Sequence, residues 1–331
     1  YAWVVLPRDD VKPSESFDFV GMLLLSPGLA AFLFGVSSIP EAGTILDTTV
    51  LSWTAIGTVL IIAFVPWALR PTNIHPLVDL RLLKNKNMTV AVIAMMLFAI
   101  AFFGASLLFP LYFQEVRGES ALKAGLLLAP QGIGAMFTMP IAGVLADKIG
   151  PGKVVLTGIT VITVGMGMFT QIEATTGYTY LISALFIMGL GMGCTMMPIM
   201  SAALATLTEP NIARGSTFLN ISQQVAASIG TALFSVLLTN GLKGSDNLGL
   251  LAAVGGLKDQ PGKLADLLAD AGLTPAQLPL LQARALADMA DAFSSVFVVA
   301  TVLVACCLIP AAFLPRTKSK KAVDPTVLVG H

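Results

Sequence analysis

Residues 143 to 153 read Gly143-Val-Leu-Ala-Asp147-Lys148-Ile-Gly150-Pro-Gly-Lys153, a short charged turn between two long apolar stretches. Charged side chains make up only 11% of the chain, so a compact polar turn at this place needs an explanation. One interpretation is a capped hairpin whose basic residues stay on one side of a membrane. The other is a latch that forms in one conformation of the protein and breaks in another.

The residues of this turn have separate predicted roles. We expect Gly143 to let two helices approach closely. We expect the Asp147 carboxylate to accept hydrogen bonds from free amides at the start of the following helix. Gly150 and Gly152 allow a tight reversal of the chain.

The composition is that of a membrane protein. Hydrophobic residues make up 56% of the chain and the mean hydropathy is +0.84, whereas soluble domains carry roughly 25% charged residues. Hydrocarbon cannot pair exposed backbone groups, so long apolar runs must form helices. We predict an all-α, polytopic membrane protein with eight transmembrane helices. The runs cover residues 18–37, 49–69, 88–112, 122–146, 154–172, 179–207, 215–238 and 292–314.

Several functional classes are disfavoured. A net charge of zero provides no basic field for nucleic acid, so we expect no nucleic-acid partner. Cys194, Cys306 and Cys307 lie inside apolar runs and are predicted to be packing residues. The cysteines and the two histidines form no cluster that predicts a metal site. We find no nucleophile and base for catalysis inside the membrane, so we expect neither an enzyme nor a bound cofactor.

Orientation is predicted from Lys and Arg, which are retained on the cytoplasmic side. With eight spans both ends share one side, and placing them in the cytoplasm puts 13 of the 19 basic residues there. These are Arg8, Lys12, Arg70, Arg81, Lys84, Lys86, Lys148, Lys153, Arg214, Arg316, Lys318, Lys320 and Lys321.

The loop of residues 70–87 contains two prolines and is the best candidate for a domain boundary. We predict one unit over residues 1–72, with the end of a preceding helix, a cytoplasmic linker and two spans. A second unit over residues 73–331 would hold six spans, arranged as two triplets, and a long outer loop at 239–291. Within that loop we expect residues 241–262 to be irregular and a helix to begin at Thr274-Pro275-Ala-Gln277.

Two sets of residues are candidates for lining a cavity. Met188, Met192, Met196 and Met200 recur at four-residue spacing and form one helical stripe. Ordinary packing is the more frequent reason for such a stripe, although pliable thioethers also suit varied apolar ligands. The second set is polar, with hydrogen bonding between helices and cavity lining as its alternatives. Its members are Gln131, Asn220, Gln224 and Ser228.

A family resemblance rests on the turn and on three further segments. The turn resembles the motif Gly-x-x-x-Asp-Arg/Lys-x-Gly-x-Arg/Lys of the major facilitator superfamily, except that Pro151-Gly152 precedes Lys153. The other segments are Leu111-Tyr-Phe-Gln-Glu-Val-Arg-Gly-Glu-Ser-Ala-Leu-Lys-Ala-Gly125, the pair Pro130 and Pro140, and Arg214-Gly215 with Asn220-Ile-Ser-Gln-Gln224-Val-Ala-Ala-Ser228-Ile-Gly230. Together they are similar to the drug:proton antiporter branch with fourteen membrane helices, the EmrB/QacA type.

The resemblance implies a C-terminal six-helix bundle preceded by two linker helices, in a bacterial cytoplasmic membrane. It implies an exporter of small lipophilic or amphipathic substrates, driven by the proton gradient and completed by an N-terminal six-helix half. Gly143, Asp147, Lys148, Gly150 and Lys153 would then control conformational switching.

Proton coupling needs an ionisable group at membrane depth. The apolar runs contain none, because Asp18, Asp147 and Asp291 lie at their ends. We therefore expect the proton-carrying carboxylate in the N-terminal half. A lipid or metabolite exporter stays open as an alternative, and a permease subunit of an ATP-driven pump is a more remote one.

Overall fold

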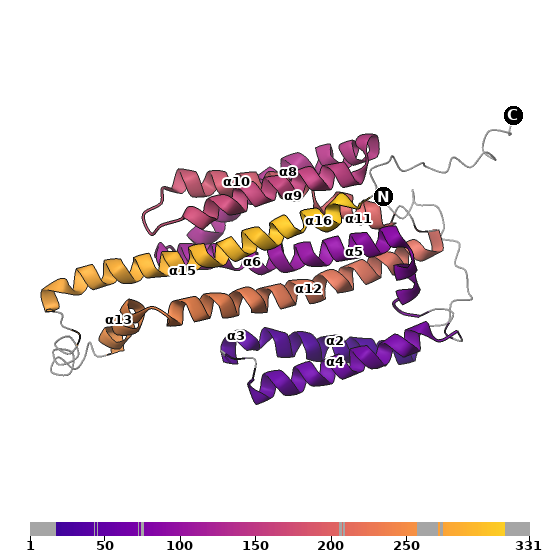
Figure 1. Cartoon of the computed structure of the whole chain (residues 1–331), viewed down its shortest axis with the longest axis horizontal. Helices are drawn as coiled ribbons and strands as arrows, with labels where there is room; N and C mark the ends of the chain where they lie inside the picture. The colour runs from indigo at the N-terminus through magenta and orange to yellow at the C-terminus, as the bar shows by residue number, and fades with distance from the viewer. Residues whose placement is uncertain are drawn as a thin grey trace, which may run out of the picture.

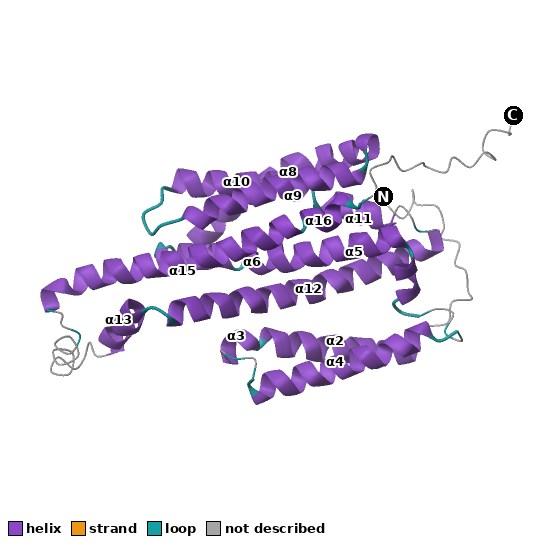
Figure 2. Cartoon of the chain, in the orientation of Figure 1, coloured by secondary structure: helices purple, strands orange, loops and turns teal. Residues whose placement is uncertain are grey.

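The computed structural model describes residues 18–314, except residues 43, 45, 72, 74, 75, 205, 206, 208, 257–270, 272 and 273. The regular secondary structure of these residues is entirely helical (Figure 2). This confirms the predicted all-α class. The predicted end of a preceding helix, at the N-terminus, lies outside the described residues.

Eight helices or helix groups are long and apolar enough to cross a membrane, as predicted. They are α2 (Phe19–Ser37), α4 (Thr48–Leu69), Lys86–Val116, α8 (Ala121–Ile149), Pro151–Gln171, Tyr178–Leu204, α12 (Glu209–Lys243) and Leu278–Ala312.

Four of these groups are interrupted, and shorter helices connect others. The third comprises α5 (Lys86–Phe98), η2 (Ala99–Phe103), α6 (Gly104–Ser106), α7 (Leu108–Leu111) and η3 (Tyr112–Val116). The fifth comprises α9 (Pro151–Met168) and η4 (Phe169–Gln171), the sixth α10 (Tyr178–Gly193) and α11 (Met196–Leu204), and the eighth α15 (Leu278–Cys306) and α16 (Leu308–Ala312). The connecting helices are α3 (Ile39–Ala42), η1 (Leu80–Lys84), α13 (Asp246–Gly256) and η5 (Pro275–Gln277).

Short polar side chains begin several of the spans. The Asp18 carboxylate accepts a hydrogen bond from the Gly21 amide at 2.8 Å, and Asp47 accepts one from Thr49 at 2.8 Å. Asn85 caps α5 in the same way. These caps satisfy amides that have no partner within the helix. Polar groups are therefore placed where the hydrocarbon ends.

The helices form three groups (Figure 1). The first group is the α2–α4 hairpin, which packs against α12. The second group is central and consists of α12 with η2, α6 and α15, which α12 contacts. The third group consists of α8, α9 and α10, which contact one another on the side of α15 away from the hairpin. The central helices thus separate the hairpin from the α8–α10 group.

Aromatic rings fill the core between the third, fifth and eighth spans. Phe109, Phe169 and Phe297 are fully buried, and their ring centroids lie 4.9 to 5.1 Å apart. Tyr112 joins this core and donates a hydrogen bond to the Glu173 carbonyl at 2.8 Å. The ring contacts hold together segments that are far apart in the sequence.

The predicted irregular segment at 241–262 is partly helical, which corrects that prediction. Residues Asp246–Gly256 form α13, and the Ser245 hydroxyl accepts a hydrogen bond from the Leu248 amide at 3.2 Å. The Asp288 carboxylate on α15 accepts hydrogen bonds from Ser245 and Asn247. These contacts between helices supply the stability that the local glycine-rich sequence did not predict.

The predicted helix start near Thr274 is confirmed. Residues Pro275–Gln277 form η5, which leads directly into α15. The Gln277 side-chain oxygen accepts a hydrogen bond from the Thr274 amide at 2.8 Å, which is one half of the predicted capping box.

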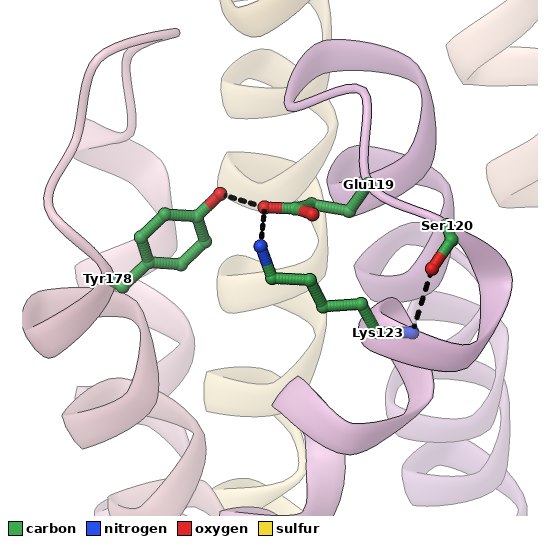
Figure 3. Close-up of polar contacts among 4 residues, drawn as sticks. All are labelled: Glu119, Ser120, Lys123 and Tyr178. Atoms are coloured by element: carbon green, nitrogen blue, oxygen red, sulfur yellow. Dashed lines mark hydrogen bonds and ion pairs between the residues drawn. The ribbon is translucent and has the colours of Figure 1, made fainter.

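A cluster at one end of the bundle ties the start of α8 to the start of α10 (Figure 3). The Glu119 carboxylate accepts a hydrogen bond from the Tyr178 hydroxyl and lies 2.9 Å from the Lys123 ammonium. The Arg117 guanidinium lies 4.6 Å from the centroid of the Tyr178 ring. Hydrogen bonds from Lys123 and then Tyr178 hold the pKa of the Glu119 carboxyl below its usual value. We call these four residues the Tyr178 cluster.

The contact between α8 and α10 depends on Gly189. A methyl group added there would lie 2.0 Å from the Gln131 carbonyl oxygen of α8, so Gly189→Ala must push the two helices apart. We expect a loss of about 1–3 kcal/mol of unfolding free energy, as for other overpacked sites. Denaturant unfolding of the purified protein in detergent measures this. Gly132→Ala is the matched control, since an added methyl on that side of α8 meets nothing within 4 Å; equal stability of the two variants would contradict the proposed contact.

The Tyr178 cluster predicts a pH dependence. Because the pKa of Glu119 is lowered from 4.5, its contribution to stability is present above pH 4.5 and is lost as the pH falls through the lowered pKa. We therefore expect Glu119→Gln to lower the melting temperature at pH 7, and we expect the difference from wild type to shrink as the pH falls below 4.5 and through the lowered pKa. The control is Glu173→Gln, since the exposed Glu173 carboxylate makes no ion pair with the described residues. A difference that did not shrink on acidification would refute this account.

Candidate functional site

The charged turn lies between α8 and α9. Gly150 has φ 92° and ψ 142°, a region that favours glycine, and Pro151 begins α9. The predicted reversal at Gly150 is therefore confirmed. Gly152 is buried inside α9 without a positive φ, so its predicted part in the reversal is wrong.

Asp147 does not cap the next helix, contrary to prediction. The N-cap position of α9 is Gly150, and no side chain bonds to the free amides there. Asp147 belongs to the last turn of α8, and the proline that follows Gly150 already removes one amide that needs a partner. Asp147, Lys148 and Lys153 are all exposed. Within the described part of the chain, no hydrogen bond or ion pair engages the Asp147 carboxylate.

Gly143 makes no close approach to another described helix, which corrects that prediction. An added methyl group at Gly143 would meet nothing within 4 Å. The neighbouring Ala142 and Ala146 are buried instead, and they pack against Val154 of α9. Gly143 and Asp147 are four residues apart and so share the opposite, exposed face of α8.

The polar cavity candidates lie on two helices. Asn220 and Gln224 are exposed on α12, Ser228 is half-buried below them, and Gln131 is half-buried on α8. None of these four side chains hydrogen-bonds to a residue that the structure describes. The structure does not bring Gln131 together with the others, so a shared cavity stays a prediction.

The methionine stripe crosses a break between two helices. Met188 and Met192 belong to α10, which ends at Gly193, whereas Met196 and Met200 belong to α11. Met188 is fully buried against Gly165 of α9, and the other three pack partly buried against the same core. This placement favours the packing interpretation of the stripe.

The sequence analysis did not identify Asp18 as an organising residue. Its carboxylate accepts hydrogen bonds from the Gly21 amide, the Trp67 indole at 2.9 Å, the Asn73 amide group at 3.2 Å and the Leu77 backbone at 3.1 Å. Burial acts to raise the pKa of Asp18, but the hydrogen bonds from these four groups outweigh it and lower the pKa. An aspartate just before an apolar run, with a tryptophan at the end of the next run, was the available signal.

The charged groups of the described spans lie near span ends except for Arg284, Asp288 and Asp291, which lie inside the N-terminal half of α15. No three His, Cys, Asp or Glu side chains in the described ranges gather closely enough to hold a metal ion. The described residues therefore present an apolar bundle whose polar groups are few and concentrated at two ends.

Comparison with known proteins gives several relatives. The chain is 44% identical over 326 residues to the multidrug resistance protein B homolog of Mycobacterium tuberculosis, covering 98% of this chain and 60% of that protein. It is 30% identical over 235 residues to the multidrug export protein EmrB of Escherichia coli, covering 70% of this chain and 45% of that protein. The lincomycin resistance protein LmrB of Listeria monocytogenes is 30% identical over 233 residues, or 70% of this chain and 49% of that protein.

The chain thus spans about 60% of the length of the Mycobacterium tuberculosis relative. The family profile described as Major Facilitator Superfamily matches residues 14–231. The profile match and the sequence identity lead to one conclusion: this chain belongs to the Major Facilitator Superfamily.

Proposed function

We propose that this chain is part of a proton-coupled exporter of lipophilic or amphipathic compounds that works by alternating access. The observation that carries the proposal is the 44% identity, over 98% of the chain, to a protein named for multidrug resistance. The names of the other two relatives, for multidrug export and lincomycin resistance, agree with it. The family is one of transporters, and we propose no enzymatic step.

The exposed apolar face of α8 supports the proposal that another part of the protein packs against this bundle. Among the eight spans α8 is the least buried, and Phe137 and Val144 are 59% and 54% exposed. We propose that an N-terminal six-helix half of the same protein covers this face. Gly143 and Asp147 lie on it, so a contact made there would change whenever the two halves rock against each other.

The helix pairing supports the proposed units, with a boundary near residues 72 and 73. In the proposed six-helix unit the first span packs on the fifth, the second on the fourth, and the third on the sixth. A twofold axis that relates the two triplets exchanges the first span with the fourth, the second with the fifth and the third with the sixth. This exchange converts the pair of first and fifth spans into the pair of fourth and second spans, and it keeps the pair of third and sixth spans. This is the pattern of the inverted repeats found in transporters.

We propose that the end of the bundle with the charged turn faces the cytoplasm of a bacterium. Seven described basic residues lie at that end, whereas four lie toward the other. The seven are Arg70, Arg81, Lys84, Lys86, Lys148, Lys153 and Arg214, and the four are Arg117, Lys123, Lys243 and Arg284. Retention of positive charge on the cytoplasmic side favours this orientation.

A lipid or metabolite exporter is the alternative within the family. An apolar bundle with few polar groups suits both kinds of cargo, and Gln131 or Asn220 would contact either. We propose that the proton-carrying group lies in the N-terminal half of the protein. The apolar run at 292–314 contains no charged residue, and the carboxylates of α15, Asp288 and Asp291, precede it.

Export is tested with the complete protein in cells that lack their own multidrug exporters. We expect preloaded ethidium, a lipophilic cation, to leave the cells faster than from empty-vector cells. We expect a protonophore to abolish this difference, because transport would depend on the proton gradient. Export that persisted unchanged after the gradient collapsed would contradict proton coupling.

The exposed turn is tested by Asp147→Asn in the same cells. Loss of a charge-assisted contact worth about 1.5 kcal/mol should reduce efflux roughly tenfold while membrane insertion stays intact. Asp246→Asn, another exposed carboxylate outside the turn, serves as the control and should leave efflux unchanged. Wild-type efflux by Asp147→Asn at equal expression would remove the latch hypothesis.

A further inference from the structure

A cavity of about 290 Å³ lies between the α2–α4 hairpin and the six-span bundle. Leu25 on α2, Phe64 on α4 and Phe218 on α12 form three of its walls, and Val78 and Leu80 close the end next to the Asp18 network. None of the predicted cavity residues on α8, α10, α11 or α12 lines this space. It is therefore separate from the site considered above.

The lining of this cavity is apolar and carries no charged side chain. It contains two hydroxyl groups, those of Thr58 and Ser222. The Thr58 hydroxyl donates a hydrogen bond to the Thr54 carbonyl at 2.7 Å. A ligand here therefore needs a mainly hydrocarbon body and no charge.

Ser222 differs from Thr217 and Thr231 of its own helix. Thr217 and Thr231 each donate to the carbonyl four residues earlier, both at 3.0 Å. Ser222 is only 8% exposed, and its hydroxyl hydrogen-bonds to none of the residues that the structure describes. The hydroxyl is therefore free to donate a hydrogen bond to a ligand in the cavity, or to accept one.

The cavity reaches the surface that faces the bilayer. Ile62 and Val65 line it, and they are 62% and 39% exposed on the spanning helix α4. A molecule dissolved in the hydrocarbon can thus enter without crossing a polar surface. Its volume lies at the lower end of the ~300–1,000 Å³ typical of ligand pockets, which favours a small occupant.

We infer that this cavity binds a small, uncharged, lipophilic molecule that carries one hydrogen-bonding group, and that Ser222 is its polar contact. The inference does not rest on the proposed export, because binding is measured here without transport. The efflux experiment tests export, and the labelling experiment below tests this site, so one proposal can fail while the other holds.

Benzophenone is a suitable probe, since it is small, uncharged and photoreactive and has a single hydrogen-bond-accepting carbonyl. We would irradiate the complete protein with it in phosphatidylcholine nanodiscs and map the adducts by mass spectrometry. We expect saturable labelling within residues 58–65 and 218–225. Diphenylmethane, which has the same shape without the carbonyl, should compete more weakly.

Two variants make the test specific. Ser222→Ala should raise the dissociation constant of benzophenone roughly 2- to 10-fold, the range that one hydrogen bond provides, and should leave diphenylmethane competition unchanged. Ser235→Ala, on the same helix outside the cavity, is its control. Val225→Phe should fill the cavity and abolish labelling of both segments, whereas Leu233→Phe, at an exposed position of α12, should not.

The inference is overturned if labelling is spread evenly over exposed faces such as that of α8. It is also overturned if Ser222→Ala affects benzophenone and diphenylmethane equally, or if Val225→Phe is labelled like wild type. Because Ser222→Ala removes a single oxygen atom, it keeps the test decisive even if the larger side chain at Val225 prevents folding.

Discussion

Hydrocarbon offers no hydrogen-bond partner to a peptide amide, and the rest of this structure follows from that constraint. Each span satisfies its backbone internally, and the amides left over at helix starts are met by short polar side chains such as Asp18, Asp47 and Asn85. The chain therefore concentrates its few charged and polar residues where spans end. Both the charged turn and the Tyr178 cluster are consequences of this placement, at opposite ends of α8.

Within the membrane, close packing must replace the hydrophobic effect as the force between helices. The contact of Gly189 with the Gln131 carbonyl brings α10 directly onto α8, and the rings of Phe109, Phe169 and Phe297 fill the core beside η4 and α15. One side of α8 is thus fixed firmly, while the side with Gly143 stays uncovered. A helix held on one side and bare on the other is suited to make and break a contact without disturbing its own bundle.

The sequence predicted the eight spans well because long apolar runs admit little else in a membrane, and Gly150 because a tight turn requires a positive φ. It did not predict the break between α10 and α11 or the wide turns of η2, since the same residue types occur in unbroken helices. The cap assigned to Asp147 failed because Gly150-Pro151 moved the start of α9 beyond its reach. Candidate site residues such as Gln131 and Gln224 depend on how each helix is rotated, which packing across the whole bundle decides.

The hairpin shows how a single polar group organises apolar surroundings. Asp18 bonds to Trp67 on α4 and to the Leu77 backbone, and the next residue, Val78, lines the cavity that also contains Ser222. Hydrogen bonds therefore fix the hairpin at that end, whereas mainly apolar side chains face the cavity along the rest of its wall. Apolar contacts are non-directional, so a guest of similar chemistry can replace them at little cost. The directional hydrogen bonds at Asp18 would hold the hairpin in place while such a ligand enters. The hydrogen bonds at one end of the hairpin and the apolar cavity along the rest of it would therefore act together.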